Sequence, residues 1–154
     1  DLTMKDYIKE IVASFQETSK NDFIFNIDQD SNKKKISKSI EIIYGLRNFI
    51  GNANKFCSNK VFITLKSNNE LTEILIEDDG NGFPNDVISK IGEPYLKSLK
   101  ERKKDKIGLG LGMFIGKTLL EKNFASVKCK NSQTRSGAEI TISWKNRELF
   151  KNLM

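Results

Sequence analysis

Asn48, Asn52 and Lys55 are the first residues whose types and spacing could do chemistry. On a helix they share one face, because Asn48 and Asn52 are one turn apart and Lys55 follows within the next turn. Two amides and an ammonium group could hold a metal–phosphate group, and amide oxygens suit Mg²⁺, which keeps most of its waters and needs few protein ligands. Taken alone, however, the stripe is more simply explained as a solvated polar face.

A second group is Asp78-Asp-Gly-Asn-Gly82, a DxGxG pattern at the end of a predicted strand. A buried carboxylate at a strand end can accept a hydrogen bond from an amino group such as that of adenine. The glycines would let the chain turn sharply beneath a planar base. Asp-Gly and Asn-Gly are also ordinary hairpin signals, so a plain turn remains an alternative.

The third group is the glycine cluster Gly108-Leu-Gly-Leu-Gly112. It fails the dinucleotide-binding pattern because Met113 stands where that pattern needs a further small residue, and no strand leads into it. A Walker A loop is excluded too, since Gly116-Lys117-Thr118 would need a glycine at the position of Leu111. A helix beginning here would still offer free N–H groups and a positive dipole end to phosphates. A flexible glycine hinge explains the cluster equally well.

Composition excludes several other kinds of site. The chain contains no histidine, which excludes Ser-His-Asp and Cys-His catalysis within it. Cys57 and Cys129 do not have metal-ligand spacing, so a zinc site is not expected. The net charge of +6 comes largely from Lys33–Lys35 and Lys97–Lys106. Aromatic residues are not interleaved with these lysines as in stacking platforms, so nucleic-acid binding is not expected.

Hydrophobic periodicity and turn signals predict the elements that would position these groups. Adjacent strands joined by short loops favour a mixed, mostly antiparallel sheet covered on one face by helices, which is a two-layer α+β sandwich. The predicted helices cover residues 4–16, a long helix capped by Ser37 and running to about 56, 85–91, 109–122 and a short one within 145–154. The predicted strands cover 22–28, 60–66, 71–78, 125–131 and 138–144, and residues 93–107 are predicted as a mobile loop.

The three groups follow one another in the order Asn-x-x-x-Asn-x-x-Lys, DxGxG and GxGxG. This order resembles the Bergerat-type ATP-binding domain shared by gyrase, Hsp90, MutL and histidine kinases. The resemblance extends from about residue 5 to residue 145. ATP-hydrolysing members have a water-activating glutamate at the position of Asn48, which favours the kinase branch. The segments GLRNFIGNANKF, DDGNGF, IGEPYLKS, GLGLGMFIGKTLLE and ITISW are similar to the RegB/PrrB redox-responsive sensor kinases.

Specific roles follow from the resemblance. It implies that Asn52 holds Mg²⁺, that Asn48 and Lys55 contact phosphates as the catalytic pair, and that Asp78 binds the adenine amino group. The remaining implied ATP-binding residues are Phe56, Gly80, Gly82, Phe83, Lys97, Gly108, Leu109, Gly110, Leu111 and Gly112. Two departures from the family pattern are visible: the F box is reduced to 92–95, and the usual Gly-Thr of the last box is Gly137-Ala138.

The resemblance also implies a function. Residues 17–154 would be the catalytic ATP-binding domain of a sensor histidine kinase, and residues 1–16 the first helix at the end of a linker. ATP would donate its γ-phosphoryl group to a histidine on a separate dimerisation domain, and a response regulator would receive it in a phosphorelay. The full protein would be a homodimer, with this domain on the cytoplasmic side of the inner membrane. The alternatives are a serine kinase of the anti-sigma-factor type or a nucleotide-sensing module and, less compatible with Asn48, a gyrase- or Hsp90-like clamp.

Overall fold

The computed structural model describes residues 2–28, 33–88 and 104–150, with the side chains of α4 described from Gly112 onward. The helices are α1 (Met4–Gln16), α2 (Ile40–Phe56), α3 (Asn85–Ile88), α4 (Lys104–Lys122) and α5 (Asn146–Leu149). The strands are β1 (Leu2–Thr3), β2 (Asp22–Ile27), β3 (Lys35–Ile36), β4 (Lys60–Ser67), β5 (Leu71–Asp78), β6 (Ser126–Asn131) and β7 (Ala138–Lys145).

The main sheet has the strand order β2-β4-β5-β7-β6. β2 runs parallel to β4, and every other neighbouring pair is antiparallel. The register places Ile63 opposite Ile76, and Ile76 opposite Ile140, so large apolar side chains line up across the three central strands. A separate two-stranded sheet pairs β1 with β3.

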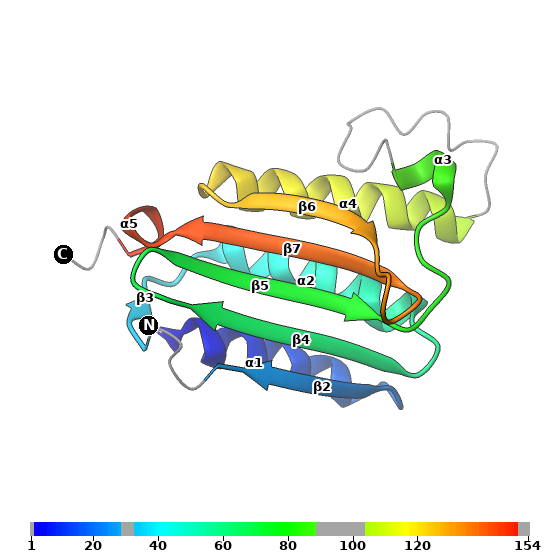
Figure 1. Cartoon of the computed structure of the whole chain (residues 1–154), viewed down its shortest axis with the longest axis horizontal. Coiled ribbons are helices and arrows are strands. Elements are labelled where there is room, and N and C mark those ends of the chain that lie inside the picture. Colours follow the sequence, from blue (N-terminus) through cyan, green and yellow to red (C-terminus); the bar gives the residue numbers. More distant parts are fainter. Residues whose placement is uncertain (1, 29–32, 89–103, 151–154) are drawn as a thin grey trace.

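The helices α1, α2 and α4 lie against one face of the sheet (Figure 1). Burial alternates along β4 and β5, since every second side chain faces this helical layer. Each large side chain buried there contributes roughly 1.5–3 kcal/mol relative to exposure. The fully buried residues include Ile8 of α1, Leu46 and Ile50 of α2, Leu120 of α4 and Trp144 of β7. The predicted two-layer α+β sandwich is confirmed.

The start of α2 differs from the prediction. Its N-cap is Ser39, whose hydroxyl oxygen accepts a hydrogen bond from the backbone N–H of Ile42 at 3.2 Å. The predicted cap, Ser37, is wrong because Lys35–Ile36 are held in extended conformation by pairing with β1. The helix therefore begins only where the chain leaves that small sheet.

The start of α4 also differs. The helix begins at Lys104, upstream of the predicted start at Leu109, so residues 104–107 are helical rather than loop. Each helical glycine costs about 1 kcal/mol relative to alanine, but tertiary packing overrides this propensity. A Cβ on Gly116 would come within 2.9 Å of the Phe49 ring, so the absence of a side chain at Gly116 lets α4 lie close to α2. The rest of the predicted loop, and residues 89–91 of the predicted short helix, lie outside the described residues.

Candidate nucleotide-binding site

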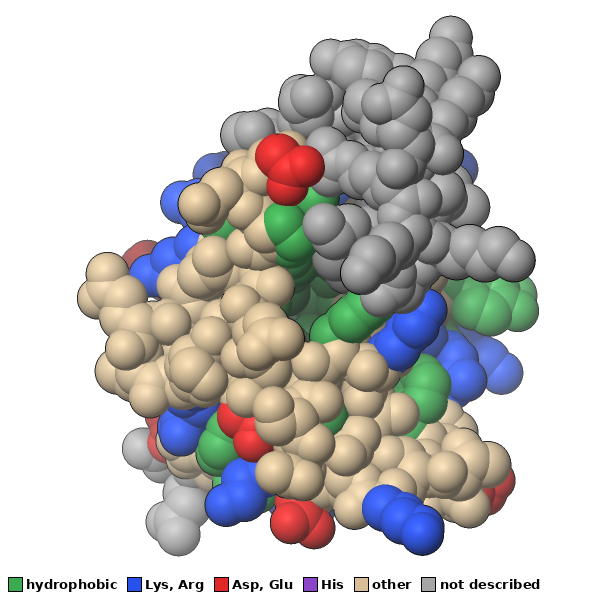
Figure 2. Space-filling view, turned by 90° about the vertical axis from the view of Figure 1, so that its right-hand side faces the viewer, with side chains coloured by type: hydrophobic (Ala, Val, Ile, Leu, Met, Phe, Trp, Pro, Cys, Tyr) green, Lys and Arg blue, Asp and Glu red, His purple; other side chains and the backbone are tan. Residues whose placement is uncertain are grey.

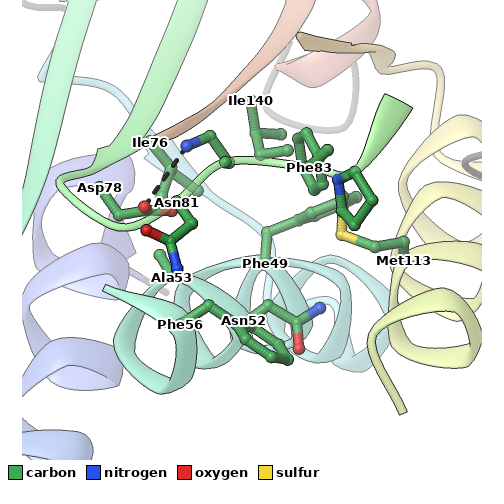
Figure 3. Close-up of a pocket in the computed structure, with 13 residues that line it drawn as sticks. Phe49, Asn52, Ala53, Phe56, Ile76, Asp78, Asn81, Phe83, Met113 and Ile140 are labelled. Carbon is green, nitrogen blue, oxygen red and sulfur yellow. Dashed lines mark hydrogen bonds between the residues drawn. The ribbon is translucent and has the colours of Figure 1, made fainter. Parts of the chain in front are cut away.

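A cavity of about 220 Å³ opens between α2, α4 and the carboxyl end of β5. It is smaller than the roughly 300–1,000 Å³ of pockets that enclose a whole drug-sized ligand, and is nearer the size of one planar ring system. Figure 2 shows hydrophobic side chains at the bottom of this hollow. The apolar residues that line it include Phe49, Ala53, Phe56, Ile76, Phe83, Met113 and Ile140, arranged around the cavity in Figure 3.

Asp78 is the carboxylate of this cavity. It is the last residue of β5 and is only 4% exposed. Its Oδ1 accepts hydrogen bonds from the backbone N–H groups of Gly80 (2.8 Å) and Ala138 (3.3 Å). Burial raises the pKa of Asp78 above its ordinary value, and these two backbone hydrogen bonds only partly oppose that effect. Within the described residues Oδ2 makes no hydrogen bond, which leaves it available to a donor in the cavity.

The turn after Asp78 is shaped by glycine and held from a distant strand. Gly82 has a φ of +78°, a conformation that favours glycine. Next to it, the side-chain amide of Asn131 in β6 brackets Phe83. Asn131 Oδ1 accepts from the Phe83 N–H at 2.7 Å, and Asn131 Nδ2 donates to the Phe83 carbonyl at 3.1 Å. This pair of hydrogen bonds fixes Phe83, which lines the cavity.

Asp79, the next residue, binds backbone groups outside the cavity. Its Oδ1 accepts from the backbone N–H groups of Ser58, Asn59 and Lys60 at 2.9, 3.0 and 3.0 Å. Burial alone would raise the pKa of Asp79, but these three hydrogen bonds outweigh it and lower the pKa. Asp79 thus ties the turn to the connection between α2 and β4, and the two adjacent carboxylates have opposite electrostatic environments.

Asn52 lies where α2 faces α4. It lines the cavity, and its Nδ2 is buried without a hydrogen-bond partner. A Cβ built on Gly112 would lie 3.2 Å from this nitrogen, so Gly112 keeps space open beside the amide. Within the described residues the Asn52 oxygen makes no hydrogen bond either. A buried amide nitrogen without a partner is costly, and a ligand in the cavity would supply one.

Asn48 and Lys55 lie outside the cavity lining. The Asn48 Nδ2 donates to the Tyr44 carbonyl at 2.8 Å, and its side chain faces the glycines of α4. The Lys55 ammonium nitrogen is 5.2 Å from the centroid of the Phe56 ring, on the exposed side of α2.

The structure brings together five of the predicted site residues. Asn52, Phe56, Asp78, Gly82 and Phe83 all line the cavity. Gly80 packs beneath the turn, where a Cβ would overlap the Phe56 carbonyl oxygen, and Gly112 lies beside Asn52. The stretch Gly108, Leu109, Gly110 and Leu111 lies inside α4 rather than at its first turn, so the predicted helix start at this cluster is wrong. Lys97 lies outside the described residues.

Several residues of the site were not predicted. Ile76 and Ile140 line the cavity, and the alternation of β5 and β7 was the signal that could have found them. Asn81 lines it as well, although the sequence suggested only a turn residue. No local sequence pattern pointed to Asn131, because its hydrogen-bond partner Phe83 is distant in sequence.

The residues present fit an adenine nucleotide with a divalent cation. The apolar cavity and the free oxygen of Asp78 suit a planar base with an exocyclic amino group. Among the described residues, no group of three His, Cys, Asp or Glu could hold a metal ion. A cation here would be bound by an amide oxygen and by phosphate oxygens, which is the set that Mg²⁺ accepts.

Comparison with known proteins identifies the family of the chain. Residues 38–148 match the family described as histidine kinase-, DNA gyrase B- and HSP90-like ATPase. The sensor histidine kinase RegB of Cereibacter sphaeroides is 33% identical over 130 residues, which cover 75% of this chain and 28% of that protein. The sensor protein RstB of Escherichia coli is 28% identical over 99 residues, covering 64% and 23%. The chain thus spans less than a third of the curated relatives it matches.

Solved structures show the same fold. The mycobacterial sensor histidine kinase MprB superposes with a TM-score of 0.73 at 18% identity, covering 94% of this chain and 96% of that one. The nucleotide-free catalytic domain of histidine kinase ThkA gives 0.72 at 19% identity, covering 93% and 92%. Within the described residues, none of the helices has the length and hydropathy of a membrane span. This chain belongs to the family of histidine kinase-, DNA gyrase B- and HSP90-like ATPases, as an ATP-binding domain of the kind that sensor histidine kinases carry.

Proposed function

We propose that this domain binds Mg²⁺-ATP and that, in the full protein, the γ-phosphoryl group passes to a histidine on a separate dimerisation domain and then to a response regulator. The observation that carries the proposal is Asp78. It is a buried carboxylate at the end of an apolar cavity, with one oxygen held by the backbone and the other free for an amino group.

In this proposal each side of the site has its own task. The base lies in the apolar cavity, and Asp78 accepts a hydrogen bond from its amino group. The oxygen of Asn52 would hold Mg²⁺, and the cation would supply neutralisation of phosphate charge. Asn48, Lys55, Lys97 and the residues of 108–112 lie on the phosphate side, where their task is positioning and charge neutralisation.

Asn48 favours phosphoryl transfer over hydrolysis. A carboxylate at this position could accept a proton from water, whereas an amide cannot act as a general base. In the structure the Asn48 Nδ2 N–H group already donates a hydrogen bond to the Tyr44 carbonyl oxygen at 2.8 Å, and the amide oxygen is directed elsewhere. The domain therefore has no carboxylate at this position to consume ATP before an acceptor arrives.

The helix α1 links this domain to the rest of the proposed kinase. Its residues Tyr7, Ile8, Ile11 and Val12 are buried in the core, so a helix entering from a dimerisation domain would be anchored here. We propose that residues 17–154 form the nucleotide-binding unit and that residues 1–16 join it to that domain. The full protein would be a homodimeric sensor at the inner membrane, with this domain in the cytoplasm.

Two measurements test the proposal. Calorimetric titration of this chain with ATP should show binding that Mg²⁺ strengthens. The full-length protein, incubated with ATP labelled on the γ-phosphate, should become labelled on histidine, which gives an acid-labile product. Acid-stable label on a serine of another protein would instead establish a serine kinase of the anti-sigma-factor type. Absence of nucleotide binding at millimolar ATP would overturn the proposal.

A further inference from the structure

The cavity contains one polar side chain that the proposed contacts do not use. Only three of the side chains that line it are amides or carboxylates: Asn52, Asp78 and Asn81. Asn52, in α2, lies beside Gly112 of α4. In the proposed function, Asp78 accepts a hydrogen bond from the amino group of the base. Asn81 belongs to the same turn as Asp78, and Figure 3 shows its amide on the same side of the cavity as the carboxylate.

Asp78 alone leaves part of an adenine edge without partners. Its Oδ1 is occupied by the N–H groups of Gly80 and Ala138, so only Oδ2 is available to the ligand. One acceptor can bind one of the two hydrogens of an adenine amino group. The other hydrogen and the neighbouring ring nitrogen would face a cavity whose remaining wall is mostly apolar. Leaving such groups unpaired out of water costs free energy.

The amide of Asn81 has the chemistry that completes this edge. It carries an acceptor and two donors, and among the described residues it makes no hydrogen bond. An asparagine amide pairs with adenine through two hydrogen bonds, one to the amino group and one to N7. We propose that Asn81 is a specificity-determining residue that reads the N6–N7 edge of adenine while Asp78 holds the second amino hydrogen.

This inference rests on the proposed function, since it assigns a residue to the same nucleotide. The two can be tested separately, because only the proposed Asn81 contact involves N7 of adenine. 7-Deaza-ADP replaces this nitrogen by carbon and leaves the amino group in place. It is therefore the probe for the proposed contact.

The experiment measures the dissociation constants of ADP and 7-deaza-ADP by calorimetry for the unmodified chain, Asn81→Ala and Asn81→Asp. The unmodified chain should bind 7-deaza-ADP about 3- to 10-fold more weakly than ADP, as expected for the loss of one hydrogen bond. Both variants lack the donor to N7, so both should bind ADP at least about 3-fold more weakly, and neither should prefer ADP to 7-deaza-ADP. Asn81→Ala should lose at least as much affinity for ADP as this single bond accounts for, because it removes both proposed hydrogen bonds. Asn85→Ala, at an exposed asparagine that does not line the cavity, is the matched control and should behave as the unmodified chain.

Folding and binding failures are distinguishable in this design. Asn81 is exposed and has negative φ, so alanine fits its backbone and the melting temperature should not change. Equal affinity of the unmodified chain for both ligands would overturn the role of Asn81 while leaving the ATP site intact. Discrimination that persists in Asn81→Ala would assign N7 to another group and also overturn it. Binding of neither ligand would overturn the proposed function itself.

Discussion

The substitutions Asp78→Asn and Asp79→Asn should have opposite effects on the stability of the domain, and only Asp78→Asn should weaken nucleotide binding. Asp78→Asn keeps the side-chain shape but can turn an N–H group toward the amino group of the base, in place of the free acceptor Oδ2. The loss of this hydrogen bond and the mismatch of two donors should cost about 1–3 kcal/mol of binding free energy. Calorimetry should then show an ADP affinity about 5- to 150-fold weaker.

The same substitution should raise the melting temperature of the nucleotide-free domain. The folded-state pKa of Asp78 is raised by burial, so its protonated form stabilises the fold, and that contribution is lost as pH rises through the folded-state pKa. At neutral pH the buried charge is a cost that asparagine removes. ADP affinity of the unmodified chain should also fall as pH decreases toward this pKa, whereas that of Asp78→Asn should not.

Asp79→Asn is the matched control. Its pKa is lowered in the folded state, so the ionised form stabilises the fold above the unfolded-state pKa, and this contribution is lost as pH falls through the folded-state pKa. An amide oxygen accepts the three backbone hydrogen bonds more weakly, which should cost about 1 kcal/mol of stability at neutral pH. ADP affinity should be unchanged because Asp79 does not line the cavity. Unaltered ADP affinity in Asp78→Asn, or equal losses of affinity in both variants, would refute this reasoning.

Three further predictions concern single positions. Gly137→Ala should lose about 1–3 kcal/mol in urea denaturation, because its Cβ would overlap Oδ1 and the backbone carbonyl oxygen of Asp78. An unchanged midpoint and slope would contradict this. Phe124→Gly should gain about 1 kcal/mol, seen as a melting temperature about 3 °C higher, because Phe124 has a φ of 71° at the end of α4. A lower melting temperature would show that contacts of the ring outweigh this strain. Asn52→Ala should bind ATP without the Mg²⁺-dependent gain in affinity, measured by calorimetry with and without the cation, and a preserved gain would remove Asn52 as the metal ligand.

Local sequence patterns predicted most of the fold because most of its elements are specified locally. The alternation of β4 and β5 marks the residues that face the helices, and the predicted bounds of β5 are those observed. The errors occur where contacts distant in sequence decide. Pairing of β3 with β1 moved the N-cap of α2 to Ser39, and packing against α2 allowed glycines to lie inside α4.

The site was predictable to the extent that its residues lie in short patterns. A strand end and a helix face bring functional groups to fixed places, which is why local patterns pointed to Asp78 and Asn52, and both line the cavity. The hydrogen bonds from Asn131 to Phe83 join residues distant in the chain, and no local spacing encodes them. The cavity position of Asn81 depends on the turn geometry set by Gly82. Pattern reasoning therefore found the chemical groups but missed the residues that orient them.

The parallel pairing of β2 with β4 has a consequence for dividing this chain. The family match begins at residue 38, after both α1 and β2. A fragment starting there would turn β4 into an edge strand, with its backbone groups unpaired where Phe23 through Ile27 now lie opposite Val61 through Leu65. It would also expose the apolar surface that α1 covers. Such an edge is a template for pairing with another molecule, so the shortened fragment should self-associate instead of remaining monomeric.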